Sequence, residues 1–565
     1  MKTGRTMNQV SEPSSASQGG MHGANPGKSN INAAIHAVSA SELTRRDWLC
    51  STGGALLAGI TGITGIAGVA GLVGMAGPAA AQSAPKRGGV LRVSGAANPS
   101  SLDPQTGGAG SDHTYLWVLY DTLVEWDYST LNPKPGMASW TFADPKTMVL
   151  TIKPGITFHD GNAMDAAAVK FNLDRGREHQ RSNIKADLSS IEATEVTGPL
   201  QLTIKLKRPD SALPAILSDR AGMMISPKAT EQFGNDFDRN PVGAGPWKFV
   251  SWADNQKIVT TRHDKYWRSD RGFLDAIEFA IIPELATGLR SVVAGQNDLV
   301  YSLPPRLKPI AEKAKGVVFA QGPTLYIHQL WLNVAKKSLE NIKVRQALNY
   351  AIDREAFLKA ALNGIGEVAT MQLPINHWAY DKSVSTLYPY DPTKARKLLE
   401  EAGYKNNLEI TCGSYTDQDS VRRAEIMIEQ LSKVGIKLTF TRGTVAEISA
   451  QFFSPEKKFD TLLSAWTGRP DPAMTYGLMY EKSAYFNSSK HEVSPEFQAQ
   501  LAESRASDNL EVRKQVFAKI QRTVMEQALV VPLAISYEIT AMSDRVKGYK
   551  TNLLGKAKYE FLSMG

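Results

Sequence analysis

Apolar and polar residues alternate along several short segments of the chain, which is the pattern of β-strands with one buried face. In residues 148–153, for example, Met148, Leu150 and Ile152 share one face of the predicted strand. On this pattern, or on a short apolar run, we predict strands over residues 89–94, 148–153, 156–158, 201–207, 247–250, 257–260, 276–283, 327–332, 408–412 and 436–440. Turn-forming residues such as Pro154-Gly155 separate them.

Apolar residues recur every three or four positions in other segments, which predicts helices with one buried face. These segments are residues 116–124, 166–175, 344–352, 392–402 and 421–434. Asp165 and Asp391 precede two of the helices as capping residues, and Gly403 ends one of them. In the second half of the chain strands and helices alternate, which favours an α/β fold whose sheet is covered by helices.

Residues 43–82 have the pattern of a bacterial export signal. Arg45 and Arg46 precede a long apolar run without charged residues, and residues 79–81 are three alanines that fit a cleavage site. Paired arginines ahead of a glycine-rich apolar segment resemble a twin-arginine signal, the address of proteins exported already folded. We therefore expect residues 1–82 to be a disordered leader followed by a signal peptide, and the mature protein to reside in the periplasm.

Two alternatives for the leader stay open. Residues 48–77 are long enough to span a bilayer as an uncleaved anchor, although their many glycines and few leucines favour a cleaved signal. Translation could also start downstream, for example at Met21, because residues 1–42 are long for the leading part of a signal and have the composition of a disordered segment.

Composition sets further bounds on the mature part, which is 483 of the 565 residues. That length is too great for one hydrophobic core and predicts two or more packed lobes. The formal net charge of +8 falls to about +6 without the leader, and the basic residues are scattered, which disfavours nucleic-acid binding. Once Cys50 leaves with the leader, Cys412 is the single cysteine, so an internal disulfide is excluded and we expect a buried thiol.

Four segments together resemble one protein family. They are residues 153–161 (KPGITFHDG), 241–249 (PVGAGPWKF), 343–354 (KVRQALNYAIDR) and 390–395 (YDPTKA). In their order and spacing over residues 88–545 they resemble the peptide/nickel class of extracellular solute-binding proteins, which also includes dipeptide- and oligopeptide-binding members. These proteins are the receptors of ATP-binding cassette importers.

The resemblance implies an α/β periplasmic binding protein of class II type, with two lobes and an extra subdomain in the first. The first lobe would comprise residues 83–325, with the subdomain at about 133–230, and a return over residues 531–565. The second lobe would comprise residues 326–530. A ligand cleft would lie between the lobes, which close on ligand by hinge bending, and a membrane permease would recognise the closed form. The matching motifs identify the fold rather than the solute.

The resemblance also implies a Trp-x-x-Asp segment in the cleft, whose Trp packs on the ligand and whose Asp holds the free amine of a peptide. The matching residues are Trp466-Thr467-Gly468-Arg469, with an arginine at the carboxylate position. A guanidinium repels an ammonium group and forms a forked pair with carboxylate or phosphate. We therefore expect a ligand with an accessible anionic or polar group. Asp471 could still serve an amine, and Arg469 could instead turn outward or pair with Asp471.

Two further site candidates, Thr106 and Tyr115, lie in a stretch where the resemblance implies loop residues near the ligand. Tyr115 could stack on the ligand or belong to the core. The histidines have no spacing typical of a metal site, so we predict neither a metal nor a cofactor, and we expect His159 to be structural.

These observations predict a non-enzymatic receptor: the periplasmic substrate-binding component of an ATP-binding cassette importer for short peptides or peptide-like, anionic solutes. Its partners would be the small-molecule ligand and an inner-membrane permease, and we expect a monomer. Two rivals stay open, a secreted hydrolase with paired carboxylates such as Glu400-Glu401 and a sensory receptor that binds without transport. The solute itself, whether peptide, glutathione-like thiol, opine, sugar or chelated metal, is open as well.

Overall fold

The structure of this protein is a computed structural model that describes residues 85–454 and 457–565. These residues belong to one compact unit, Gln82–Gly565. The predicted leader, the signal peptide and the alternative anchor therefore lie outside the described residues. Within the described part of the chain, the helices are too short or too polar to cross a bilayer.

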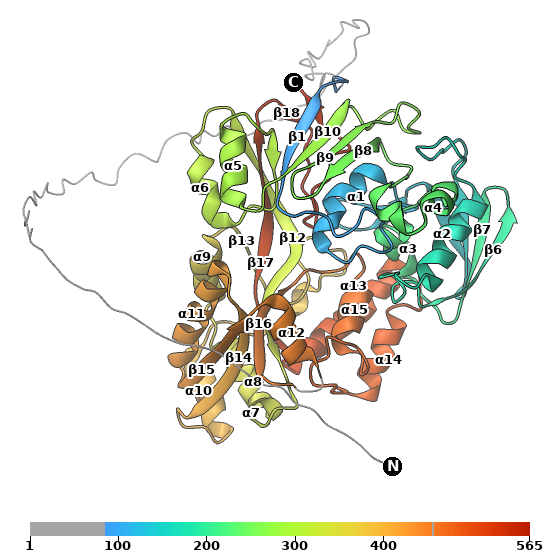
Figure 1. Cartoon of the computed structure of the whole chain (residues 1–565). Helices are drawn as coiled ribbons and strands as arrows, with labels where there is room; N and C mark the ends of the chain where they lie inside the picture. The colour runs from blue at the N-terminus through green and yellow to red at the C-terminus, as the bar shows by residue number, and fades with distance from the viewer. Residues whose placement is uncertain (1–84, 455–456) are drawn as a thin grey trace, which may run out of the picture. The chain divides into compact units, whose positions relative to one another are not determined.

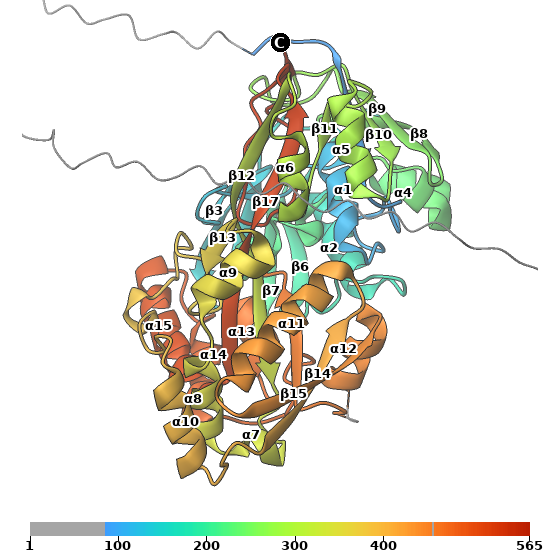
Figure 2. The same ribbon diagram turned by 90° about the vertical axis from the view of Figure 1, so that its left-hand side faces the viewer.

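One mixed sheet runs through this unit, with its strands in the order β15-β14-β16-β12-β17-β11-β1-β10-β9-β8. The long strands β12 (Val317–Leu332) and β17 (Val530–Ser543) pair antiparallel in its middle, and they extend from one half of the unit into the other (Figures 1 and 2). On one side of them lie β1 (Val90–Gly95), β8 (Trp247–Ala253), β9 (Lys257–Arg262), β10 (Ala276–Ile281) and β11 (Leu299–Val300). On the other side lie β14 (Leu408–Tyr415), β15 (Ile436–Gly443) and β16 (Thr461–Trp466), and β13 (Gly366–Val368) pairs with β17.

The pairing of β12 with β17 is interrupted where the two halves meet. The ladder runs to Pro323 opposite Tyr537 and resumes at Ile327 opposite Ile535. We call the described residues up to Pro323 and from Tyr537 onward lobe I, and residues Ile327 to Ile535 lobe II. The predicted boundaries at residues 325 and 530 fall within β12 and at the start of β17, and they stay predictions.

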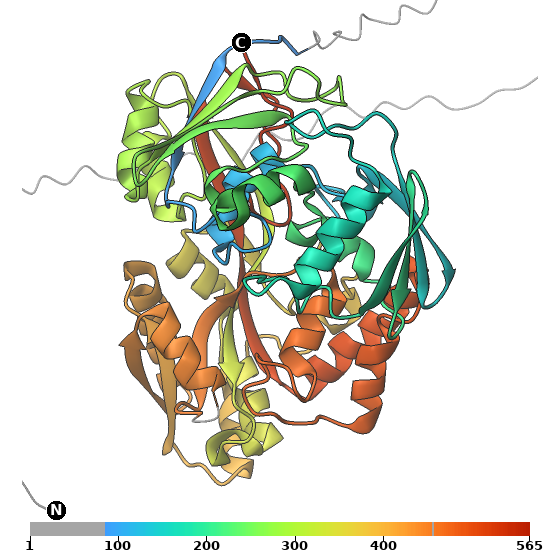
Figure 3. The ribbon, with the colours of Figure 1, turned by 45° about the vertical axis from the view of Figure 1, so that its right-hand side comes forward.

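A second sheet extends lobe I, with the order β4-β5-β7-β6. Its strands are β4 (Ala138–Asp144), β5 (Thr147–Ile152), β6 (Ile191–Gly198) and β7 (Gln201–Leu206), and α2 (Ala166–Glu178) packs on β6 and β7. In Figure 3 this cyan subdomain lies beside the red helices α13 (Pro472–Tyr480), α14 (Pro495–Glu503) and α15 (Leu510–Glu526) of lobe II. Its buried apolar residues belong to the same cluster as those of lobe II, whereas the core around β1 and β10 is separate.

The other helices are divided between the two lobes. In lobe I these are α1 (His113–Leu119), α3 (Leu213–Ile216), α4 (Pro227–Phe233), α5 (Leu285–Val293) and α6 (Lys308–Ala311). In lobe II they are α7 (Lys337–Glu340), α8 (Ile342–Tyr350), α9 (Arg354–Leu362), α10 (Pro392–Glu401), α11 (Gln418–Ser432) and α12 (Val445–Phe453). Short strands β2 (Val124–Trp126), β3 (Pro133–Pro135), β18 (Val546–Lys547) and β19 (Ser563–Met564) complete the described fold.

Most of the predicted elements are confirmed, and their capping residues act as expected. The Asp165 carboxylate accepts a hydrogen bond from Ala168 N at 2.9 Å to cap α2, and Asp391 accepts one from Lys394 N at 2.8 Å to cap α10. Gly403, which follows α10, has a φ of 91°, a conformation that suits glycine.

Three predicted elements differ from the structure. The helix expected over residues 116–124 ends at Leu119, because the loop of Gly243 and Gly245 packs on its last turn and Gly245 N donates to Leu119 O at 3.0 Å. Residues 156–158 form an isolated bridge rather than a strand, and β12 begins at Val317 instead of Ile327.

Cys412 and His159 have the expected structural environments. Cys412 is a buried free thiol whose burial raises its pKa to about 12, which suppresses thiolate chemistry. His159 bonds the backbone of the loop that packs on α1: Gly243 N donates to its Nδ1 at 3.2 Å, and its Nε2 lies 3.1 Å from Gly245 O. Burial lowers the pKa of His159 to about 3, so the ring is neutral.

Candidate ligand-binding site between the lobes

The loop that follows β16 is held in place by Trp466 and by Gly468. Trp466 is 4% exposed, and its ring packs edge-on against Trp331 and Phe486, with centroids 6.1 and 5.1 Å away. Gly468 has a φ of +72° and lies against Leu325, so close that an added Cβ would come within 2.1 Å of the Leu325 Cβ. The loop of lobe II is thereby held against the crossing strand β12.

Arg469 projects from this loop with part of its guanidinium unoccupied. Nη1 donates to Gly468 O at 2.8 Å and to Thr467 Oγ1 at 3.4 Å, and Cζ lies 4.8 Å from the centroid of the Trp466 ring. Within the described residues the guanidinium forms no ion pair. Burial lowers its pKa, while the carboxylates of Asp187 and Asp219 act in the opposite direction, which means that this side chain of lobe II reaches toward the acidic groups of lobe I.

Asp471 is bonded inside lobe II. Its carboxylate forms a two-point pair with Arg513 of α15, at 2.7 Å from Nη2 to Oδ1 and 2.9 Å from Nη1 to Oδ2. It also accepts from Ala473 N at 2.8 Å, which caps α13. The side chains of Arg513 and Asp471 are 3% and 2% exposed. The alternative in which Arg469 pairs with Asp471 is therefore wrong, and Asp471 holds the loop in place.

Three loops of lobe I meet around Thr106. Asn183 Nδ2 donates to Thr106 O at 2.6 Å, and Arg220 Nη1 donates to Gly107 O at 2.8 Å. These bonds join the loop that contains Thr106 to the loops around residues 183 and 220. Thr106 itself is half-buried, with its hydroxyl 3.1 Å from Ser101 Oγ.

Tyr115 lies in the core of lobe I. It is 1% exposed, its ring meets Phe279 edge-on with centroids 4.9 Å apart, and its hydroxyl donates to Ala97 O at 2.5 Å. Of the two environments considered for this residue, the described contacts are those of a core tyrosine that supports the loop after β1.

Most charged groups where the lobes meet are already paired. His113 Nε2 lies 2.6 Å from Asp219 Oδ1 and 3.2 Å from Lys556 Nζ. Burial opposes ionisation of Asp219, but His113 and Lys556 hold its pKa well below the usual range. Arg505 of lobe II bonds Asp210 of lobe I at 2.7 Å, which is a direct ionic contact across the lobes.

Asp187 differs from these acids. It is half-buried in a turn in which Leu188 N donates to Ile184 O at 3.2 Å, and its carboxylate has no hydrogen bond or ion pair among the described residues. Burial raises its pKa to about 6, Arg469, Arg220 and Arg505 lower it, and Asp219 raises it. Asp187 is therefore an unpaired carboxylate close to the arginines of lobe II.

This carboxylate gives a pH-dependent prediction: Asp187→Asn should stabilise the ligand-free protein more at about pH 7.5 than at about pH 4.5. The folded-state pKa of about 6 exceeds the usual 3.8, so the folded protein holds the proton more tightly and its stability falls as pH rises through this window. The shift corresponds to at most about 3 kcal/mol, and solvent screening reduces it to about 1–2 kcal/mol. Unfolding temperatures at the two pH values measure the gain.

The exposed Asp236 provides the control variant Asp236→Asn, in the same lobe, which should leave the stability unchanged at both pH values. A gain from Asp187→Asn that is equal at both pH values would mean that the carboxylate is solvated rather than buried.

A cavity of about 950 Å³ opens between the lobes beside Arg505. Lobe I contributes Arg208 and Pro209, and lobe II contributes Glu481, Lys482, Ser483, Gln498, Leu501, Ala502, Glu503, Arg505 and Ala506. Ser211 N donates to Arg505 O at 2.9 Å at its edge. The volume is in the range of small-molecule sites, but neither Trp466 nor Arg469 is among the residues that line it.

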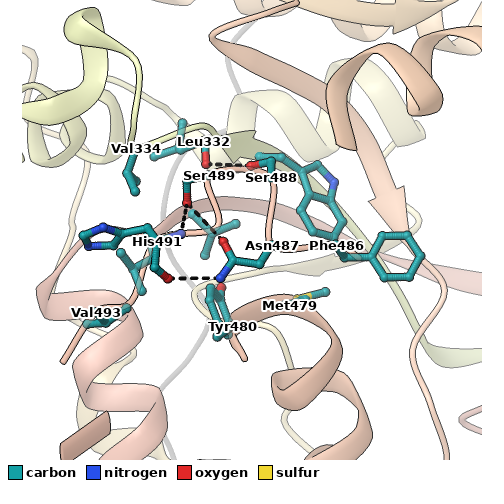
Figure 4. Close-up of a pocket in the computed structure, with 13 residues that line it drawn as sticks. Leu332, Val334, Met479, Tyr480, Phe486, Asn487, Ser488, Ser489, His491 and Val493 are labelled. Carbon is teal, nitrogen blue, oxygen red and sulfur yellow. Dashed lines mark hydrogen bonds between the residues drawn. The ribbon is translucent and has the colours of Figure 1, made fainter. Parts of the chain in front are cut away.

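A smaller cavity lies inside lobe II, between Trp331, Tyr480, Phe486 and His491 (Figure 4). Its volume of about 30 Å³ holds one or two water molecules but no peptide. Polar groups beside it bond one another, as in the contact of Asn487 Nδ2 with His491 O at 3.0 Å. Across the described residues, no three His, Cys, Asp or Glu side chains are grouped to hold a metal ion.

Several groups at this site carry no signal in the sequence. Asp187, Asp210, Asp219, Arg505 and Lys556 stand in ordinary loop sequences and come together only through the fold. Their charge alone does not distinguish them from the other acidic and basic residues of the chain.

Comparison with known proteins identifies the family. Bacterial extracellular solute-binding proteins, family 5 middle, match residues 132–488. The glutathione-binding protein GsiB of Pectobacterium atrosepticum is 29% identical over 461 residues, which cover 80% of this chain and 89% of that protein.

Solved structures share the fold. DppA of Helicobacter pylori, a periplasmic binding protein in complex with the peptide STSA, has a TM-score of 0.72 at 24% identity, over 85% of this chain and 98% of that one. The substrate-binding protein CtaP of Listeria monocytogenes has a TM-score of 0.76 at 22% identity, over 85% of this chain and 100% of that one. The predicted α/β fold with two lobes is confirmed. The chain belongs to family 5 of the bacterial extracellular solute-binding proteins.

Proposed function

We propose that this protein is the periplasmic substrate-binding component of an ATP-binding cassette importer for short peptides or peptide-like solutes that carry an anionic group. Family membership supports the receptor role. The observation that carries the anionic preference is Arg469, a guanidinium held over Trp466 between the lobes without a carboxylate partner among the described residues. Export through the twin-arginine pathway, removal of residues 1–82 and a monomeric state complete the proposal.

The proposed binding mode uses both lobes. Arg469 takes the anionic group in a forked pair, Trp466 forms an apolar wall behind it, and the exposed Thr467 offers a hydroxyl. Thr106 approaches from lobe I. A solute that touches both lobes favours their closed arrangement, which the inner-membrane permease then recognises.

Two of the predicted site residues act indirectly in this proposal. Asp471 keeps the Arg469 loop in place through its pair with Arg513, and Tyr115 supports the loop after β1 through Ala97 O. In this proposal both residues hold a loop of the site in position and do not contact the solute.

A receptor is favoured over the hydrolase alternative because the carboxylate pair considered for that role lies on the surface. Glu401 bonds Lys343 at 3.0 Å, with side chains 40% and 44% exposed, and Glu400 is exposed on α10. General acid–base work needs carboxylates positioned at a bound substrate, which this helix surface does not provide.

The test is binding of an anionic peptide-like solute by wild type and by Arg469→Gln. Glutathione is the first solute to try, because GsiB of P. atrosepticum is named for binding it; di- and tripeptides follow. Loss of a charge-assisted hydrogen bond of about 1.5–3 kcal/mol predicts at least about tenfold weaker binding, with the unfolding temperature of the ligand-free protein unchanged. Calorimetric titration and thermal shift measure the two quantities.

The exposed Arg442 of β15 supplies the matched control Arg442→Gln, which should bind like wild type. Unchanged affinity in Arg469→Gln would remove this arginine from the site. Release of a chemically altered solute would favour the hydrolase instead.

A further inference from the structure

A polar cavity of about 660 Å³ lies in lobe I, at the edge of the main sheet where β9 ends and β1 and β10 begin. In Figure 1 these strands lie toward the end of the unit that carries the C-terminus, away from β14 and β15 of lobe II. All the residues that line the cavity belong to lobe I, so it is separate from the proposed solute site. The charged residues of its lining are Arg87, Arg262, Arg268, Arg271, Asp264 and Asp275.

The two aspartates of this lining are engaged by one arginine. Arg262 Nη1 lies 2.8 Å from Asp275 Oδ1, and Arg262 Nε lies 3.4 Å from Asp264 Oδ1. The other Asp275 oxygen accepts a hydrogen bond from Gly89 N at 2.9 Å, and the Asp264 side chain is 82% exposed to solvent. These acids are therefore committed to Arg262 rather than to the other three arginines.

Arg268 has donors that no group uses in the described part of the chain. Its Nη1 lies 3.0 Å from Glu125 Oε1, whereas Nε and Nη2 have no hydrogen bond or ion pair among the described residues. The guanidinium is held in place, because its Cζ lies 4.3 Å from the centroid of the Trp267 ring. Trp267 Nε1 in turn donates to Asp121 Oδ2 at 2.7 Å. The free Nε–Nη2 edge of an arginine matches two oxygens of an oxyanion.

Three other residues of the lining also have unused donors. Arg271 Nε and His263 Nδ1 are buried without a hydrogen bond among the described residues, and His263 is 6% exposed. Arg87 donates from Nη2 to Ser269 O at 2.9 Å and has no carboxylate partner within the described ranges. Buried donors without an acceptor are costly, so this cavity favours a ligand rich in acceptors.

Positive charges crowd behind the cavity as well. Glu125 is shared, because Arg268 Nη1 and Arg271 Nη1 both lie 3.0 Å from its Oε1. Lys153 Nζ lies 5.1 Å from the centroid of the Trp267 ring on which Arg268 packs. Burial lowers the pKa of Lys153, Arg268 and Arg271 lower it as well, and Glu125 acts in the opposite direction. An added anion would relieve this repulsion between cations.

We propose that this cavity is a second binding site, which holds a phosphate-type oxyanion between Arg268 and Arg87. The free edge of Arg268 takes two oxygens in a forked pair, and Arg87 binds from the segment before β1. The volume exceeds the needs of inorganic phosphate, so a phosphate ester fits too. The phosphate group can therefore come from the free ion or from the headgroup of a phospholipid. This site goes beyond the proposed function, because it needs no residue of lobe II.

The test measures anion binding by the purified full-length chain with isothermal titration calorimetry, at neutral pH and constant ionic strength, because salt screens exposed charges. The probes are inorganic phosphate and glycerophosphoglycerol, the soluble headgroup of phosphatidylglycerol. The proteins are wild type, Arg268→Gln, Arg87→Gln, Arg469→Gln and Arg290→Gln. Arg290 is an exposed arginine of α5 in the same lobe and supplies the matched control.

Wild type, Arg469→Gln and Arg290→Gln should bind with equal affinity, and Arg268→Gln and Arg87→Gln at least about tenfold more weakly. Preference for phosphate would identify the free ion as the ligand, and preference for glycerophosphoglycerol a lipid headgroup. Arg87 is exposed and makes one hydrogen bond, so Arg87→Gln still tests the site if Arg268→Gln does not fold.

Two results would overturn this second site. One is wild type that binds neither probe, or binds no more tightly than Arg268→Gln and Arg87→Gln. The other is a loss of binding in Arg469→Gln alone, which would locate the anion between the lobes and support the anionic preference of the proposed solute site instead.

Discussion

Replacement of Asp471 by Asn is expected to lower the free energy of unfolding by about 3–5 kcal/mol, the range for a buried ion pair that loses one partner. The pair with Arg513 is deep inside lobe II, with side chains 2% and 3% exposed. The substitution leaves the Arg513 guanidinium without a counter-charge in a site that water barely reaches. A drop of this size should appear as a clear fall in unfolding temperature.

Several contacts of Arg513 make relaxation difficult. Its Nε donates to Ser504 O at 2.9 Å, and its Cζ lies 5.2 Å from the Trp378 ring centroid and 5.5 Å from that of Phe517. The side chain cannot turn to solvent without breaking this packing. Asp471 also caps α13, and Asn accepts that bond equally well, so the loss reports the ion pair rather than the cap.

Two comparisons test this interpretation. Glu409→Gln breaks the pair of Glu409 with Lys437, whose side chains are 68% and 67% exposed, and should cost less than about 1 kcal/mol. Asp471→Asn combined with Arg513→Met removes both charges and should be more stable than Asp471→Asn alone. A loss below about 1 kcal/mol in Asp471→Asn would show that water reaches the pair.

The second large effect is expected at Gly468, where replacement by Ala should destabilise the protein by about 2–4 kcal/mol. The φ of +72° disfavours any side chain, and the new Cβ would stand 2.1 Å from the Leu325 Cβ. Either the Arg469 loop or strand β12 must then move. Because β12 joins the lobes, solute affinity should fall together with stability, and chemical unfolding and calorimetric titration measure the two losses.

Gly295 provides a matched control. Its φ is +71°, and an added Cβ meets nothing within 4 Å, so Gly295→Ala should cost only about 1 kcal/mol for the backbone conformation. Leu325→Gly in the Gly468→Ala background removes the opposing Cβ and should restore part of the affinity. Equal losses of stability in Gly468→Ala and Gly295→Ala would mean that β12 can move away from the new Cβ without a loss of stability.

The elements that local patterns govern could be predicted from the sequence. Strand β7 alternates buried and exposed residues as its sequence does, and α10 starts and ends at its capping residues. The early end of α1 could not be predicted, because it depends on a loop more than a hundred positions away whose Gly245 N donates a hydrogen bond to Leu119 O. Tertiary contacts override local propensity at such places.

The site was predictable only in part. Trp466 and Arg469 could be proposed from the sequence because they match a family segment, and the reversed charge is visible in the sequence itself. That Asp471 is committed to Arg513, 42 residues away, depends on distances that no local pattern encodes. Asp187 could not be singled out, because the sequence does not show which groups surround its carboxylate. Only the folded structure shows that this carboxylate has no hydrogen bond or ion pair among the described residues.

The gap in the ladder between β12 and β17 bears on the energetics of the receptor cycle. Since backbone pairing stops at Pro323 and resumes at Ile327, rotation of one half of the molecule about this gap breaks few main-chain hydrogen bonds. The backbone contribution to the work of reorientation is correspondingly small. The free energy of solute binding then acts mainly against side-chain contacts between the lobes, such as the Arg505–Asp210 pair and the shared apolar cluster.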